Sequence, residues 1–398
     1  MIVEYRGRVL LDRGFGSADF ELNVPNDGAS IFRIGSLSKP FTAIAIMKLQ
    51  EEHKLSIDDT VCKYLTDCPP AWAPVHLRHL LSHTSGIPDY FGEVSAGPTS
   101  RMREYIDQTV KTHLSSPLSS VAGESFIYSN FGYLLLGYVC EVAAKQPWED
   151  VLRTRIFTPA GMTATAYDDV LALVPNRVRG YQRPGAVLQN IIYKDHGAFA
   201  AGGLRSTARD LLAWQHALSS GLLLTSSSLE EMLSPIHDNY ALGWQAISLL
   251  GRRSVNHSGG IDGFASHFVH YRDDDLNIVV LSNISEEPAK TTACDLARIV
   301  FGAGQTVLDQ SRTLNLPGPA LRTYAGTYSG GEHSRSIEVR SNRLFYVRGT
   351  TPLELKPLTG DRFLMERATI LAFDSTRTSL TMTDGCGTVV ATMRRVAQ

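Results

Sequence analysis

Ile34-Gly35-Ser36-Leu37-Ser38-Lys39-Pro40-Phe41 is the stretch that decides the expected fold, because it places an amine three residues after a hydroxyl. Pro40 suits a first helical turn, and the residues that follow it are apolar on almost every side, which predicts a buried helix. Residues at i and i+3 share a helical face, so the Lys39 amine would lie beside the Ser36 hydroxyl. Burial lowers the pKa of an amine, so Lys39 would accept the proton of a serine nucleophile near neutral pH.

Two further short motifs follow along the chain. Tyr128-Ser129-Asn130 is the only Tyr-x-Asn, and His257-Ser258-Gly259-Gly260 contains the only His-x-Gly. A Ser-x-x-Lys match alone arises by chance about once in several hundred residues, and a capped helix with an exposed lysine would explain it equally well. Three sparse motifs in this order are a much stronger indication of a nucleophilic serine site.

Together the three motifs resemble the set of the serine β-lactamase and penicillin-binding-protein superfamily, which is Ser-x-x-Lys, Tyr/Ser-x-Asn and Lys/His-Thr/Ser-Gly. Further segments are similar to class C-like members, which include carboxylesterases, D-aminopeptidases and peptide-cyclising thioesterases. These segments are Leu77–Pro88, Gly123–Tyr133, Ile156–Met162, Ala201–Ser206 and Gly259–Phe264. The resemblance covers residues 1 to about 300. It implies an α/β fold, with a β-lactamase/DD-peptidase-like antiparallel sheet flanked by helices and a helical subdomain.

The resemblance also assigns roles to the first two motifs. Ser36 would attack a carbonyl and form an acyl-enzyme, while Lys39 and Tyr128 would share the proton transfers. We expect Lys39 and a protonated His257 to lower the pKa of the Tyr128 phenol, because opposite charges favour its phenolate. Whether Lys39 or Tyr128 is the general base stays open. Asn130 would orient Lys39 and hydrogen-bond the acyl side chain of the substrate.

The third motif would lie on an edge strand that lines the site. Ser258, Gly259 and Gly260 would bind substrate there, and the two glycines would let it approach the backbone closely. The resemblance implies that the N–H groups of Ser36 and Gly260 form an oxyanion hole. Many members of the superfamily have lysine where this chain has His257. Histidine occurs there in esterases, D-stereospecific peptidases and peptide-cyclising thioesterases, so β-lactam hydrolysis ranks lower.

Periodic apolar patterns predict how the catalytic region is built. Residues 2–5 and 8–15 are expected to be strands that precede the buried helix. Residues 57–234 are expected to be mostly helical and loop-rich. Strands return at 243–281, and a helix at 289–301 closes the sheet.

A second domain is expected after a linker. The segment 302–320 carries glycine and proline, which predicts a linker between a catalytic domain, 1–301, and a C-terminal domain, 321–398. Seven or eight short strands predict that the C-terminal domain is a small barrel. Tyr324–Tyr328 resembles the opening of the lipocalin-like domain that follows the catalytic domain in related hydrolases. The barrel would be a lid, a binding module or a packing partner.

Composition excludes some function classes. The 398 residues carry 38 basic and 40 acidic side chains without a basic run, so neither nucleic acid nor a membrane is an expected partner. Zinc-ligand spacing is absent around His76, His79 and His83, and the resemblance implies that this segment is a structural turn into the site, so no metal or cofactor is expected.

Cysteine usage bears on the compartment. The five cysteines are scattered and lack a Cys-x-x-Cys pair, which predicts reduced thiols, although a Cys62–Cys68 pair stays open. Met1–Arg8 lacks a signal-peptide layout, so the protein is expected to be cytoplasmic, unless an export segment is missing.

We therefore expect a serine hydrolase that forms an acyl-enzyme on Ser36 and acts on small esters, amides or D-residue-containing peptides. Carboxylesterase or D-specific aminopeptidase ranks first. Acyl transfer to an amine, as in a peptide-cyclising thioesterase, ranks second, and β-lactamase or DD-carboxypeptidase third. A non-catalytic relative that binds peptide in an inherited cleft is the alternative of another class. A homo-oligomer stays open, because a sheet face without the usual N-terminal helix would need cover.

Overall fold

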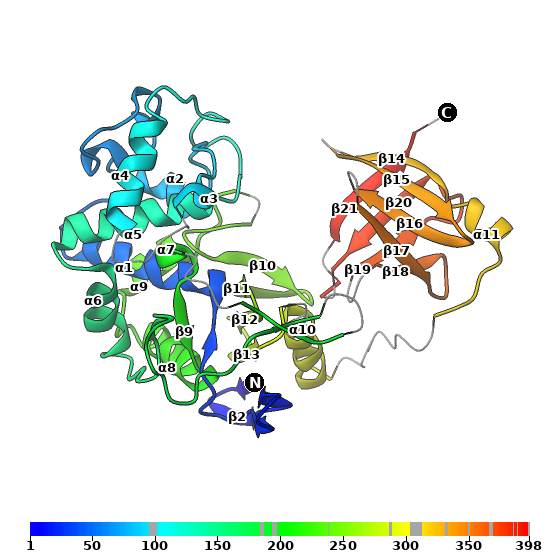
Figure 1. Ribbon diagram of the computed structural model, residues 1–398, viewed down its shortest axis with the longest axis horizontal. Coiled ribbons are helices and arrows are strands. Elements are labelled where there is room, and N and C mark those ends of the chain that lie inside the picture. The colour runs from blue at the N-terminus through cyan, green and yellow to red at the C-terminus, as the bar shows by residue number, and fades with distance from the viewer. Residues whose placement is uncertain are drawn as a thin grey trace. The chain divides into compact units, whose positions relative to one another are not determined.

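The protein folds into two compact units, as the computed structural model in Figure 1 shows. One unit consists of residues 1–248 and 253–289, and the other of residues 249–252 and 290–398. The structure describes residues 1–94, 102–183, 187–192, 197–237, 239–285, 289–302, 313–330, 333–348, 351–365, 369–384, 386–387 and 389–396.

A six-stranded sheet with the order β10-β11-β12-β13-β1-β2 is the main sheet of the fold. Its strands are β1 (Ile2–Tyr5), β2 (Arg8–Asp12), β10 (Gln245–Leu249), β11 (Arg252–Ile261), β12 (Phe264–Tyr271) and β13 (Leu276–Ser282). The first strand pairs antiparallel with the last one, with Ile2 opposite Val279. Strand β13 is buried along almost its whole length, as expected for a central strand with both faces covered. The strands predicted from the sequence are present, but β2 ends at Asp12 rather than at residue 15.

Short strands and helices make up the rest of the first unit. The small sheets contain β3 (Ser17–Asp19), β4 (Val24–Pro25), β5 (Phe32–Arg33), β6 (Ala166–Tyr167), β7 (Tyr181–Gln182), β8 (Gln189–Asn190) and β9 (Leu204–Ser206). The α-helices are α1 (Lys39–Glu51), α2 (Leu77–Leu81), α3 (Phe91–Val94), α4 (Met102–Thr112), α5 (Asn130–Ala144), α6 (Trp148–Leu152), α7 (Phe199–Gly202), α8 (Ala208–Ser219) and α9 (Ser226–Leu233). Tighter or wider turns are η1 (Gly35–Ser38), η2 (Val61–Lys63), η3 (Pro70–Trp72) and the π-helical η5 (Arg153–Phe157).

Two buried helices position the motifs. Helix α1 is buried on nearly every side, as its apolar sequence predicts, and α5 is buried from Phe131 to Cys140. The two helices pack together. Aromatic rings fix α1 from the side: Trp214 stacks on Phe41 with ring centroids 4.2 Å apart. The N-terminal ends of α1 and α5 carry the first two sequence motifs, so this packing brings distant segments together.

The second unit contains a closed barrel of eight strands, which confirms the predicted small barrel. Its strands are β14 (Gly326–Gly330), β15 (His333–Arg340), β16 (Arg343–Arg348), β17 (Thr351–Pro357), β18 (Arg362–Met365), β19 (Thr369–Phe373), β20 (Ser379–Thr383) and β21 (Val389–Arg395). Helix α11 (Gly318–Arg322) precedes it, so the end of the predicted linker 302–320 is helical. The part of that linker from 303 to 312 lies outside the described residues. Closure removes the exposed sheet edges that invite aggregation.

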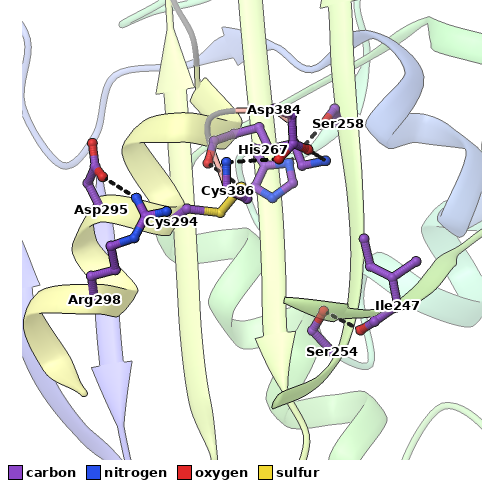
Figure 2. Close-up of a disulfide and its surroundings, with 10 residues drawn as sticks. Ile247, Ser254, Ser258, His267, Cys294, Asp295, Arg298, Asp384 and Cys386 are labelled. Atoms are coloured by element: carbon purple, nitrogen blue, oxygen red, sulfur yellow. Dashed lines mark hydrogen bonds and ion pairs between the residues drawn. A yellow bond between two sulfur atoms is a disulfide. The ribbon is translucent and has the colours of Figure 1, made fainter. Parts of the chain in front are cut away.

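Helix α10 (Ala289–Val300) groups with the barrel, although the sequence predicts it as the end of a catalytic domain at 1–301. Figure 2 shows the disulfide between Cys294 on α10 and Cys386 in the barrel hairpin. Lys290 on the same helix donates to Asp384 at 2.7 Å. The predicted domain limits of 1–301 and 321–398 remain a prediction.

The cysteines differ from the sequence-based expectation. The structure contains disulfides between Cys62 and Cys68 and between Cys294 and Cys386, and Cys140 is a buried thiol. The expectation of reduced thiols is therefore wrong for the four paired cysteines, because chain folding brings Cys294 beside a residue 92 positions away. Since disulfides persist in oxidising compartments, the cysteines no longer support the cytoplasmic localisation, which remains a prediction.

Candidate active site

Ser36 stands in the turn η1, directly before helix α1 rather than inside it. Gly35 has φ +51°, a left-handed conformation that glycine adopts at little cost. The Ser38 hydroxyl donates to the Gly35 carbonyl at 2.7 Å and accepts from the Leu204 N–H at 3.1 Å, which ties the turn to β9. The nucleophile predicted from the sequence is thus held by a short turn with its own side-chain brace.

Lys39 is the first residue of α1 and is fully buried. Its Nζ lies 3.1 Å from Ser36 Oγ, 2.8 Å from Asn130 Oδ1 and 2.8 Å from the Ala201 carbonyl oxygen. Burial lowers the pKa of Lys39 to about 7, and the charge of Asp89 raises it. The predicted proximity of the lysine and serine side chains, and the predicted lowering of the amine pKa, both agree with this geometry.

Tyr128 and Asn130 reach the same point from the start of α5. The Ser129 hydroxyl caps this helix by accepting from the Gly132 N–H at 3.1 Å, so the helix begins at Asn130. The Tyr128 hydroxyl hydrogen-bonds Ser36, and its ring lies 4.8 Å from Lys39 Nζ. The side chains of the second motif therefore lie beside those of the first, around the Ser36 hydroxyl.

The pKa of Tyr128 moves in the opposite direction to the one expected. Burial raises it to about 12, the hydrogen bond with Ser36 lowers it, and the charge of Asp89 raises it. The expected lowering of the Tyr128 pKa by two cations is wrong, because burial is the largest cause of its shift. Tyr128 is therefore a neutral phenol near neutral pH.

His257 is neutral, which corrects the expectation of a protonated ring. Its Nδ1 donates to the Ser258 carbonyl at 2.7 Å, and the Tyr240 hydroxyl donates to its Nε2 at 2.9 Å. Burial, followed by the charge of Lys39, lowers the pKa of His257 to about 3. Both ring nitrogens are occupied within the protein, so this histidine does not supply a positive charge to the site.

Strand β11 carries the third motif, but it is not an edge strand, because β10 lies beyond it in the sheet order. The Ser258 hydroxyl hydrogen-bonds His267 Nδ1 at 2.8 Å on the neighbouring strand β12, as Figure 2 shows. Neither His257 nor Ser258 lines the cavity at Ser36. The structure thus brings Ser36, Lys39, Tyr128 and Asn130 together and leaves these two side chains outside.

The two glycines of the third motif have different surroundings. A Cβ on Gly259 would lie 1.8 Å from the Ile34 carbonyl oxygen, so this glycine lets the η1 turn pack on the strand. A Cβ on Gly260 would meet nothing within 4 Å, because this position faces the cavity. Both glycines were expected to let substrate approach the backbone closely. Only Gly260 has open space beside it, so the expectation is wrong for Gly259. Ser266 adds a hydrogen bond of 2.8 Å to the Ile34 carbonyl and so holds the turn on β12 as well.

A cavity of about 260 Å³ opens at Ser36. It is lined by Gly35, Ser36, Phe91, Tyr128, Asn130, Ala198, Ala201, Gly202, Gly260, Ile261 and Asp262. Asp262 is the only acidic or basic side chain in this lining, among the residues that the structure describes. The cavity therefore offers a carboxylate and several hydrogen-bonding groups but no positively charged group from the described lining.

Sequence interpretation missed some residues that shape the site. The Asp89 carboxylate accepts from the Phe131 N–H at 2.8 Å, and its charge acts on both Lys39 and Tyr128. The Ala201 carbonyl is a partner of Lys39 that no side-chain motif can reveal. Asp89 follows the segment Leu77–Pro88 directly in the sequence, which is the one signal that pointed to it.

Neither a cluster of metal ligands nor a membrane-spanning helix is present in the described part of the chain. No group of three or more His, Cys, Asp or Glu side chains in that part could hold a metal ion. None of its helices has the length and apolar character needed to cross a bilayer.

Known proteins share both the sequence and the fold. The family model described as Beta-lactamase matches residues 1–303. Penicillin-binding protein 4* of Bacillus subtilis (strain 168) is 30% identical over 400 residues, which cover 92% of this chain and 87% of that protein.

Two solved structures extend the likeness in three dimensions. The octameric penicillin-binding protein homologue from Pyrococcus abyssi superposes with a TM-score of 0.72 at 24% identity, covering 96% of this chain and 91% of the other. The D-amino acid amidase from Ochrobactrum anthropi SV3 in complex with D-phenylalanine gives a TM-score of 0.60 at 24% identity, covering 71% and 85%. At these identities the two structures establish the shared fold.

Proposed function

The chain belongs to the Beta-lactamase family of serine hydrolases, and from this membership we propose that it forms an acyl-enzyme on Ser36 with Lys39 as the general base. The observation that carries the proposal is the position of Lys39 Nζ, between Ser36 Oγ at 3.1 Å and two acceptors at 2.8 Å. The substrates we propose are small esters, amides or D-residue-containing peptides. The fold is shared with a D-amino acid amidase, which is why amides of D-residues are included.

The contacts of Lys39 suit a neutral amine in this proposal. An NH₂ group has two N–H donors and one lone pair. The Asn130 side-chain oxygen and the Ala201 carbonyl are acceptors, so they take the two N–H groups. The lone pair then faces Ser36 Oγ, whose proton it accepts during attack on the substrate carbonyl.

The proposed reaction then proceeds in balanced steps. Ser36 Oγ bonds to the carbonyl carbon, its proton moves to Lys39, and the backbone N–H groups of Ser36 and Gly260 stabilise the oxyanion. Tyr128, as a neutral phenol, donates its proton to the leaving alcohol or amine and regains one from Lys39. Water repeats these steps on the acyl-enzyme and releases the acid.

The pH profile is the first prediction. Because the pKa of Lys39 is about 7 and the neutral amine is the reactive form, kcat/KM should rise with pH and level off above that value. Below it, kcat/KM should fall about tenfold per pH unit. The pH dependence of kcat/KM is measured from pH 5 to 9.5 with an uncharged ester. Circular dichroism first shows that the fold is unchanged over this pH range. If kcat/KM did not fall below about pH 7, the result would contradict the role of Lys39 as the general base.

Charge in the cavity predicts the preferred substrate. Asp262 is the one acidic or basic side chain among the described residues that line the cavity, so we propose that a free carboxylate near the scissile bond is disfavoured. D-alanyl-D-alanine and its C-terminal amide differ only in that carboxylate. We expect the amide to be hydrolysed at least about tenfold faster than the free acid. Asp262→Asn should bring the two hydrolysis rates closer together. This argument ranks esterase or amidase above β-lactamase and DD-carboxypeptidase, whose substrates carry such a carboxylate.

The hydrolysis rates of the amide and of the free acid are measured at saturating and at low substrate concentrations. The difference between the two substrates can then be assigned to kcat or to KM. Faster hydrolysis of the free acid would contradict the proposed substrate class and favour a carboxypeptidase. Hydrolysis of neither peptide, with turnover of p-nitrophenyl butyrate, would favour a carboxylesterase.

Self-association is also proposed. Strand β2 ends the sheet order, and its Val9 and Leu10 are each 48% exposed. Phe20 and Leu22 between β3 and β4 are 48% and 73% exposed. An octameric homologue shares the fold, and exposed apolar side chains beside a sheet edge favour association. Size-exclusion chromatography with light scattering should give a mass above that of one chain, and a stable monomer would contradict the proposal.

A further inference from the structure

We propose that His83 is a positioning residue that holds Tyr128 in place for proton transfer. The sequence places His83 in the segment Leu77–Pro88, for which only a structural turn was expected. His83 is buried and does not line the cavity, so it would act through Tyr128 and not on substrate. The inference rests on the proposed function, because it requires Tyr128 to take part in the reaction.

Hydrogen bonds from His83 hold the backbone on both sides of Tyr128. The Ile127 N–H donates to the His83 carbonyl oxygen at 2.8 Å. The Ser129 N–H donates to His83 Nδ1 at 3.0 Å. One residue therefore fixes the residue before Tyr128 and the residue after it, which leaves little freedom for the peptide units between them.

The His83 ring also supports the Tyr128 ring directly. The two ring centroids lie 4.2 Å apart with the planes inclined by 31°. On its other sides the imidazole meets Tyr240 and Tyr133, with centroids 4.8 Å and 5.1 Å away. The imidazole thus packs against Tyr128 and against two further tyrosines, while its hydrogen bonds to the neighbouring residues hold the Tyr128 loop.

The protonation state of His83 matches this role. Because Nδ1 accepts the Ser129 N–H, the ring proton of the neutral form is on Nε2. Burial, and then the charge of Lys39, lowers the pKa of His83 well below its usual value. A protonated ring would lose the acceptor and release Ser129, so the neutral ring is the form that holds the loop.

The backbone of His83 limits which replacements are informative. His83 has φ +58°, in the left-handed region that Asn and Gly adopt more readily than other residues. Asn also offers a side-chain oxygen close to the position of Nδ1, whereas Gly offers no acceptor. His83→Asn and His83→Gly therefore both suit the backbone and differ in the hydrogen bond to Ser129. His83→Leu has the size of Asn without an acceptor and serves as a third variant.

The test is a double-mutant cycle with Tyr128→Phe, measured as kcat and KM for an uncharged ester on the full chain. His83→Gly should lower kcat by about 10- to 100-fold with a smaller change in KM, because the Tyr128 phenol is displaced from Ser36 while the other residues that line the cavity stay in place. His83→Asn should stay within about threefold of wild type. In the Tyr128→Phe background, His83→Gly should lower kcat by less than about threefold, because the phenol hydroxyl that His83 positions is already absent.

The control is His79→Asn, because His79 Nδ1 also accepts a backbone N–H, from His76 at 3.2 Å, on the same segment. Equal losses in both backgrounds, or equal losses for Asn and Gly, would overturn the inference. If His83→Gly does not fold, His83→Asn and His83→Leu still compare a side chain that has a hydrogen-bond acceptor with one that lacks it. A Tyr128→Phe variant with wild-type kcat would instead show that the proposed role of Tyr128 as proton donor is wrong, and an active Ser36→Ala variant would show that the proposed function is wrong, so these failures can be told apart.

Discussion

Ser36→Ala should abolish hydrolysis, with kcat reduced by about 10⁴-fold or more, because the acyl-enzyme forms on this hydroxyl alone. Alanine keeps the turn η1, since the hydrogen bond from Ser38 to the Gly35 carbonyl and the contact of Gly35 with Gly260 do not involve the Ser36 side chain. The residual rate should be set by binding and by the backbone donors. It is measured with p-nitrophenyl butyrate and with a D-alanyl amide.

Ser226→Ala is the matched control, because Ser226 is an exposed serine at the start of α9 and should leave kcat unchanged. Thermal unfolding of both variants should match that of the wild type within a few degrees. Equal activity in wild type and Ser36→Ala would contradict the serine hydrolase proposal and favour a binding protein that retains the family's cleft.

Lys39→Met should lower kcat by about 10³-fold, since methionine has a similar length but cannot accept the Ser36 proton. Any residual activity should lack the limb near pH 7, because the amine whose pKa is about 7 has been removed. This second effect separates loss of the base from a general disturbance of the site. The variant is compared with the wild type over the same pH range.

Lys48→Met on the same helix is the control for Lys39→Met. Lys48 lies in the last turn of α1 and pairs with Glu51 at 3.6 Å, away from the cavity lining. Partly exposed pairs of this kind, near the surface, contribute roughly 0 to 1 kcal/mol, so activity and stability should change little. A Lys39→Met variant that keeps the limb near 7 would contradict the assignment of the base.

The order of the motifs predicted that the side chains of the first two motifs meet, but it also placed His257 and Ser258 at the site, and neither lines the cavity. Ser36 and Lys39 are neighbours on one turn, so their distance follows from local geometry. Tyr128 and Asn130 join them because α1 and α5 are both apolar nearly all round and pack together. The eight-stranded barrel was predictable from regularly spaced short strands and turns.

Protonation states were not predictable in the same way. The pKa of Tyr128 was expected to fall, yet burial raises it to about 12. The ring of His257 was expected to carry charge, yet its two partners, the Tyr240 hydroxyl and the Ser258 carbonyl, leave it neutral. These outcomes depend on how much water the folded chain excludes and on which groups a strand register brings near, and a motif encodes neither.

Long-range backbone contacts were the second kind of information that the sequence lacks. Gly259 was expected to admit substrate, whereas its missing side chain admits the Ile34 carbonyl. Cys294 and Cys386 form a disulfide that no spacing rule would pair. His83 acts on the residues around Tyr128 through a backbone carbonyl and one ring nitrogen, which a search for metal-ligand spacing cannot detect.

The most direct test of the acyl-enzyme is the intact mass of the protein after brief reaction with a fluorophosphonate, followed by peptide mapping. The account predicts one adduct per chain, located on the peptide that contains Ser36. The adduct should form much more slowly in Lys39→Met and be absent in Ser36→Ala. No adduct in the wild type, an adduct on another residue, or equal labelling of Ser36→Ala would contradict the central claim.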